Sequence, residues 1–192
     1  MNPLLSAPAI LIDPQDGWRR SEKEIGDPAD LMLRYVAPLA AIPAVFGFIG
    51  ACVIGVVTPH VGPVRTPLLD GFLEAIIGYL ESFLLVLLLA LIVNLSAPLF
   101  GGRRNYVSAL KLIVFSYTPV WLTGIFLILP GLRFLMLSSF YGVYVLVVGL
   151  PLLMRTPKQR TAGFAALILV FACALTFIAA AAQTTLFGTP SL

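Results

Sequence analysis

The chain has 192 residues, of which 59% are hydrophobic and 11% are charged, and its formal net charge is +3. A soluble domain of this size cannot bury so much apolar surface, and the mean hydropathy is +1.00. The composition therefore excludes an ordinary soluble domain and predicts an integral membrane protein. Its basic residues flank apolar runs instead of forming one patch, so membrane topology explains them and nucleic-acid binding is not expected.

Residues 1–34 form a polar, proline-interrupted N-terminal segment without the basic stretch and short apolar core of a cleavable signal peptide. Asp13 followed by Pro14 predicts a helix start, and Trp18 and Ile25 then share one helix face. We expect this amphipathic helix to lie in the headgroup layer, although an ordinary solvated helix has the same pattern.

Five apolar runs follow, each long enough to cross a hydrocarbon core about 30 Å thick. Because no polar segment between them could build a second core, the fold class is all-α: a five-transmembrane-helix bundle over residues 35–184, then a short tail, 185–192. The predicted spans are residues 35–57, 72–99, 107–129, 132–154 and 161–183.

Small residues recur every three or four positions in the first span, and similar faces occur in the fourth and fifth. In lipid, such faces permit close approach of a second helix, so helix packing is their default interpretation. They are Ala40, Ala44, Gly47, Ala51 and Gly55 in the first span, Ser138, Gly142 and Gly149 in the fourth, and the alanines of the fifth.

The second helix is predicted to begin at Pro67 and continue to Leu99, a length of roughly 50 Å, so it must tilt or begin outside the membrane. Glu74 and Glu81 lie on one face of it. Glu81 is about 27 Å from Leu99 along the helix axis, near the outer interface, where ionisation costs less than at the bilayer centre.

Two polar contacts are predicted from the depth at which the side chains lie in the membrane. Asn94 and Lys111 lie at similar depths in helices joined by a short turn, so we expect Lys111 to donate to the Asn94 side-chain oxygen; the alternative is that Lys111 snorkels to the headgroups. Arg133 follows the turn after the third span, and it would pair with Glu74 and Glu81 if the second and fourth helices touch.

The third span contains Pro119, which has no N–H for the carbonyl of Phe115 and crowds that turn of the helix. The favoured interpretation is a structural kink, and the alternative is a functional hinge or site that includes Ser116 and Tyr117. The hydroxyls that could satisfy the freed carbonyl are those of Ser116, Thr118 and Thr123.

Motifs for catalysis and metal binding are missing from the sequence. It contains no H-E-x-x-H, G-x-S-x-G or phosphate-binding glycine loop. The single histidine, His60, lies in a proline-rich loop, and Cys52 and Cys173 lie in apolar runs as reduced packing residues. We therefore expect no enzyme activity, no cofactor and no metal.

Ten of the twelve lysines and arginines fall on the N-terminal side of the predicted bundle, and Arg65 and Arg133 fall on the other. By the positive-inside rule, the N-terminus is cytoplasmic and the C-terminus lies outside.

A series of turns and spans resembles the Yip family of integral membrane proteins, with its bacterial branch the closer match. The likeness is strongest from about residue 99 to 166. The resemblance implies a five-helix bundle in the bacterial inner membrane with a cytoplasmic N-terminus. The residues that carry it are Phe100-Gly101-Gly102-Arg103-Arg104, Ala109-Leu110-Lys111, Phe115-Ser116-Tyr117-Thr118-Pro119, Leu129-Pro130-Gly131-Leu132, Tyr144 with Gly149-Leu150, and the N-terminal stretch from Ile10 to Trp18.

Eukaryotic relatives bind Rab/Ypt GTPases and shape membranes, but the acidic-Tyr-Gly-Pro motif of those relatives is missing from Asp27 to Pro38. That role is therefore not carried over, and the resemblance implies no activity.

These observations favour a non-enzymatic interaction or membrane-organising protein. Its partners would be the lipid bilayer and either another membrane protein or further copies of itself. The rival class is a small transporter or an ion- or proton-conducting protein that uses a helix broken at Pro119. Its cavity would be lined by Asn94, Lys111, Ser116, Tyr117 and Thr118 in the inner half and by Glu74 and Glu81 in the outer half.

Overall fold

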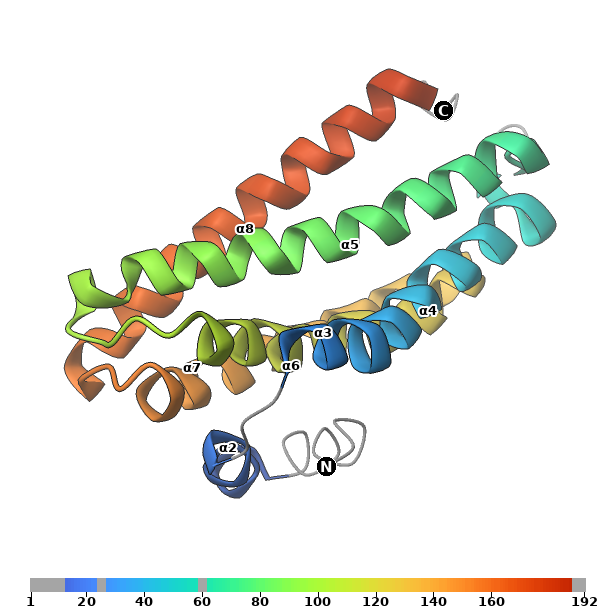
Figure 1. The fold of residues 1–192 in the computed structure, drawn as a ribbon. Helices are drawn as coiled ribbons and strands as arrows, with labels where there is room; N and C mark the ends of the chain where they lie inside the picture. The colour runs from blue at the N-terminus through green and yellow to red at the C-terminus, as the bar shows by residue number, and fades with distance from the viewer. Residues whose placement is uncertain (1–12, 24–26, 59–61, 188–192) are drawn as a thin grey trace.

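The structure is a computed structural model that describes residues 13–23, 27–58 and 62–187, and nearly all of these residues are helical (Figure 1). A short antiparallel hairpin, β1 (Val56–Thr58) with β2 (Gly62–Val64), connects the first two spans. The helices are α2 (Pro14–Lys23), α3 (Pro28–Leu31), η1 (Met32–Val36), α4 (Ala37–Phe48), η2 (Ile49–Ile54), α5 (Leu68–Ser96), η3 (Ala97–Phe100), α6 (Tyr106–Thr123), η4 (Gly124–Ile128), η5 (Pro130–Phe140), α7 (Tyr141–Leu153) and α8 (Lys158–Phe187).

Within the described part of the chain, five helical runs are long and apolar enough to cross a membrane, which confirms the predicted all-α bundle with five spans. In Figure 1, α5 lies between α8 and α4. The five runs are Pro28–Ile54, Leu68–Phe100, Tyr106–Ile128, Phe134–Leu153 and Lys158–Leu186.

The third of these runs, which contains α6, is the central helix of the bundle. In its most apolar stretch 61% of the residues are buried, compared with 17–28% in the other four spans. Every residue from Ala109 to Ser116 is buried. The helix packs against α5 on one side and α7 on another, with α4 also in contact. The neighbouring spans therefore separate residues 109–116 of α6 from lipid, whereas Val120 and Leu122 are exposed.

Glycines of α7 bring that helix into close contact with α6. A Cβ on Gly142 would overlap the carbonyl oxygen of Ser116. A Cβ on Gly149 would lie 2.5 Å from Leu112 Cδ1 and 2.7 Å from Trp18 Cε2. Both glycines of the predicted fourth-span face are thus used for packing inside the bundle, whereas Ser138 of that face is exposed.

The N-terminal helix α2 packs against the protein through its tryptophan. Trp18 is completely buried, its Nε1–H donates to the carbonyl of Val145 at 3.1 Å, and its ring meets Phe115 edge to face at 5.8 Å. The expectation that the apolar face of this helix rests in the headgroup layer is wrong for Trp18, because Gly149 leaves room for the indole against α6 and α7. Ile25, the other residue of that face, lies outside the described residues.

The two basic turns of the chain meet at one end of the bundle. The backbone N–H of Arg103, between α5 and α6, donates to the carbonyl of Met154, between α7 and α8, at 2.8 Å. Gly101, at φ +76°, faces the ring of Pro157 in the same place. The prediction that the two turns share one side of the bundle is confirmed. It gathers Arg103, Arg104, Arg155, Lys158 and Arg160 there.

We expect Gly142→Ala to destabilise the bundle by about 1–3 kcal/mol, because the new methyl group must displace the Ser116 carbonyl or move α7 away from α6. Unfolding of the purified protein in a denaturing detergent would measure the change. The control is Gly131→Ala, where an added Cβ meets nothing within 4 Å. Equal stabilities of the two variants would contradict this account of the contact between α6 and α7.

Candidate functional site

Pro119 does not break the third span. The α-helix α6 continues through the proline to Thr123 and tightens to a 3₁₀ helix in η4, which begins at Gly124. Gly124 is a point of close contact between this span and α4, since a Cβ there would lie 2.7 Å from Pro43 Cβ. The helical geometry therefore changes at the contact with α4 and not at the proline.

Two of the three hydroxyls near Pro119 bond to carbonyls other than that of Phe115, and the third, on Ser116, has no hydrogen-bond partner among the described residues. Thr118 donates to the carbonyl of Val114 at 3.2 Å, and Thr123 donates to that of Val120 at 2.9 Å. The prediction that these two side chains satisfy the freed Phe115 carbonyl is wrong. Each reaches back along the helix to a carbonyl three or four residues earlier, which is the ordinary geometry for a helical threonine.

Tyr35 of the first span is hydrogen-bonded to Thr118 at the centre of the bundle. The two side-chain oxygens are 2.7 Å apart, and both residues are buried. A threonine hydroxyl has one proton, and that of Thr118 is directed at Val114, so Tyr35 is the donor. Because lipid offers no replacement partner, this bond ties the first span to the third. Sequence reasoning missed Tyr35, although a tyrosine near the start of an apolar span signals a hydroxyl that needs a partner.

Ser116 and Tyr117 lie on a groove between α6, α7 and α8 with a volume of about 570 Å³. Ser116 is 5% exposed, and its hydroxyl oxygen has no hydrogen-bond partner. Most of the lining is hydrocarbon, and none of the described residues that line the groove is charged. The polar lining residues are Ser116, Tyr117, Ser139, Cys173 and Thr176.

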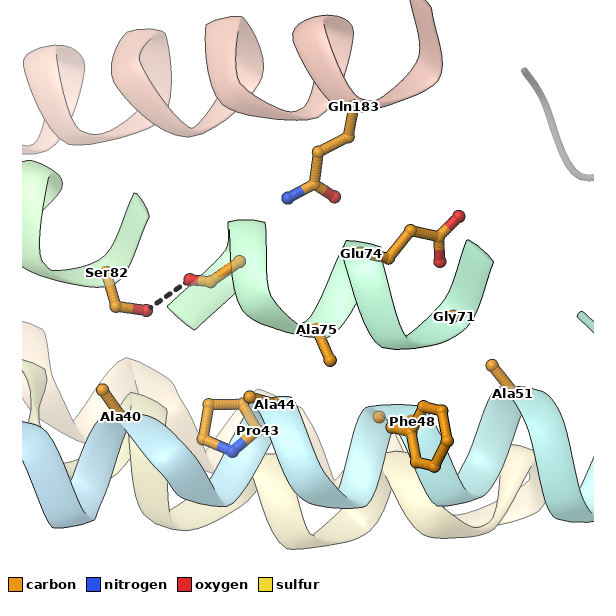
Figure 2. A pocket seen from close by; sticks show the side chains of 12 residues that line it. Ala40, Pro43, Ala44, Phe48, Ala51, Gly71, Glu74, Ala75, Ser82 and Gln183 are labelled. Carbon is orange, nitrogen blue, oxygen red and sulfur yellow. Dashed lines mark hydrogen bonds between the residues drawn. The ribbon is translucent and has the colours of Figure 1, made fainter. Parts of the chain in front are cut away.

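A second cavity of about 270 Å³ lies between α4 and α5, towards the C-terminal end of α8 (Figure 2). Four of the five residues of the small-residue face of the first span line it, so this face is turned towards α5, and its predicted close contact with a second helix is replaced there by the cavity. Small residues of α5 form the opposite wall. The polar lining residues are Glu74, Ser82 and Gln183, and Ser82 donates to the carbonyl of Gly78 at 3.0 Å.

Glu81 pairs with α8. Its carboxylate accepts a hydrogen bond from Gln183 Nε2 at 2.6 Å, which links the second and fifth spans near the C-terminal end of α8. Sequence reasoning missed Gln183. The available signal was that Gln183 is the sole amide side chain in the fifth span.

The predicted contact between Asn94 and Lys111 is not formed. Asn94 Oδ1 is buried without a hydrogen-bond partner, and Lys111 is buried as well. Two residues at equal depth in neighbouring helices make contact only if each helix is rotated so that they face each other. Depth alone does not fix that rotation, so the prediction of this contact was wrong. The side chain of Arg133 lies outside the described part of the structure, so its ion pair with Glu74 and Glu81 stays a prediction.

The residues of the rival transport pathway lie in separate places. Ser116 and Tyr117 line the groove, Glu74 lines the other cavity, and Thr118 is bonded to Tyr35. In the part of the chain that the structure describes, no group of three or more His, Cys, Asp or Glu side chains could hold a metal ion. Cys52 and Cys173 are both free, as predicted, and His60 lies outside the described residues.

The five spans, with the third buried at the centre, define a polytopic α-helical membrane protein, a class that the basic turns at one end of the bundle also fit. The chain matches the Yip1 domain over residues 9–180, and it therefore belongs to the Yip1 domain family. No curated protein and no solved structure matches it.

We expect Tyr35→Phe to lower the free energy of unfolding by about 0.5–1.5 kcal/mol, because it removes the hydrogen bond to Thr118. A double-mutant cycle with Thr118→Val would isolate this pair, and the two changes should not be additive. Tyr144→Phe is the control, since Tyr144 is half exposed. Additive effects would show that the two hydroxyls do not interact.

Proposed function

We propose that the protein is a non-enzymatic interaction or membrane-organising protein that acts through helix contacts within the bilayer. The observation that carries this proposal is the uncovered alanine face of α8. Its members are exposed and lie four, eight and seven residues apart, which are multiples of about one helical turn that keep them on one side of α8, as in faces that admit a second helix. They are Ala162, Ala166, Ala174 and Ala181.

The other small-residue faces support this choice of surface, because each is turned towards another helix of the same chain. Gly142 and Gly149 pack on α6, and the alanines of α4 face α5 across the cavity of Figure 2. The face on α8 lies on a helix that joins the bundle through α5, α7 and η3. Its partner would be a membrane-spanning helix, either of another protein or of a second copy of this chain.

The location that fits this role is the bacterial inner membrane, with a cytoplasmic N-terminus and an outer C-terminus. Support comes from the basic turns that meet at one end, since lysine and arginine are favoured in cytoplasmic loops. Arg65, in the connection between the first two spans, would then lie on the outer side.

Cysteine labelling would check this orientation. In a chain carrying Cys52→Ala and Cys173→Ala, we expect Arg103→Cys and Lys158→Cys to be protected from an impermeant thiol reagent added outside intact cells, and Arg65→Cys to react. After the cells are opened, the two protected positions should react as well. Labelling of Arg103→Cys or Lys158→Cys from outside would contradict the proposed orientation.

Copurification would test the proposed contact surface. We expect Ala174→Phe to reduce the yield of membrane polypeptides, or of a second tagged copy, at least tenfold when the full chain is purified from native membranes in mild detergent. The bulky ring would keep the partner helix away from α8. Leu84→Phe is the control, because Leu84 is an exposed residue of α5. Unchanged yields for Ala174→Phe, or an equal loss for Leu84→Phe, would contradict a contact at this face.

A further inference from the structure

One residue that lines the groove between α6, α7 and α8 has a side-chain hydroxyl without a hydrogen-bond partner. Ser116 lines the groove and is 5% exposed, and its hydroxyl oxygen is buried without a hydrogen-bond partner among the described residues. The groove itself, at about 570 Å³, is within the usual size range of small-molecule sites, about 300–1,000 Å³. A buried hydroxyl beside a cavity of that size indicates a ligand with a hydrogen-bonding group.

The depth of Ser116 restricts the charge of that ligand. Ser116 lies ten residues after the start of α6, about 15 Å along the helix axis, which is near the middle of a hydrocarbon core about 30 Å thick. A charged group is costly at this depth unless an opposite charge is present. The described residues that line the groove supply none, so the ligand is uncharged.

The volume of the groove also restricts the shape of its occupant. A transmembrane helix is about 10 Å in diameter and would fill 570 Å³ within about 7 Å of its length, which is less than two turns. A hydrocarbon chain is much thinner and fits the aliphatic and aromatic walls along their whole length. Ser139, which also lines the groove, carries a further hydroxyl that could bond to an ester or hydroxyl group.

We propose that this groove binds one neutral glycerolipid, with a hydrocarbon chain against the apolar walls and an uncharged oxygen of the lipid hydrogen-bonded to the Ser116 hydroxyl. This binding does not depend on the contact surface assigned to α8 above. Ala172, which lines the groove, and the exposed Ala174 point in different directions from the same helix, so one substitution at each position separates the two proposals.

Native mass spectrometry of the full chain in detergent micelles, with dioleoylglycerol added, tests the lipid site. We expect one dioleoylglycerol per chain, with affinity at least tenfold lower in Ala172→Phe, which fills the groove. Ser116→Ala should lower it about three- to tenfold, the range expected for one hydrogen bond. Ser82→Ala, in the other cavity, and Ala174→Phe, on the outer face, are matched controls that should bind like the unaltered chain.

A photoreactive diacylglycerol gives a second measurement that needs no variant. It should label peptides of α6, α7 or α8 that line the groove, and excess dioleoylglycerol should prevent the labelling while dioleoylphosphatidylglycerol does not. The proposal is overturned if Ala172→Phe binds dioleoylglycerol normally, if the charged lipid competes equally, or if labelling falls elsewhere. A copurifying polypeptide lost in Ala172→Phe but kept in Ala174→Phe would make a protein the occupant and would overturn it as well.

Discussion

The structure depends on one constraint: the central helix carries polar groups through a medium that cannot hydrogen-bond to them. Lys111, Ser116 and Thr118 all lie within α6, and Pro119 removes a backbone donor from the same stretch. In hydrocarbon each of these groups needs protein around it. The burial of α6, far greater than that of the other spans, meets this need, and the positions of α4, α5 and α7 follow from it.

The neighbouring helices can approach α6 this closely because they have glycines at the points of contact. Gly142 lets α7 approach the Ser116 carbonyl, and Gly149 accommodates both Leu112 and the indole of Trp18. In lipid there is little hydrophobic drive between helices, so dispersion across such close contacts carries much of the stability. The tyrosine bonded to Thr118 adds a polar tie to the same centre.

Features that depend on position along the chain were predicted correctly from the sequence. Contacts that depend on how each helix is rotated about its axis were not. Apolar length predicted five spans, and the short turns correctly predicted that Arg103 and Lys158 share one end of the bundle. Depth placed Asn94 beside Lys111, yet Asn94 Oδ1 has no partner. The seven-residue spacing of Trp18 and Ile25 predicted an apolar face on the N-terminal helix. It could not show that Gly149, far away in sequence, makes a space for the indole.

The two surfaces for which we propose occupants meet on α8. One side of it forms a wall of the groove through Ala172 and Thr176, and another side carries the exposed alanines. Gln183 holds its C-terminal part to Glu81 of α5. A ligand in the groove and a helix on the alanine face would therefore act on the same element. If either one shifts α8, thermodynamic linkage requires that each change the affinity for the other by the same factor.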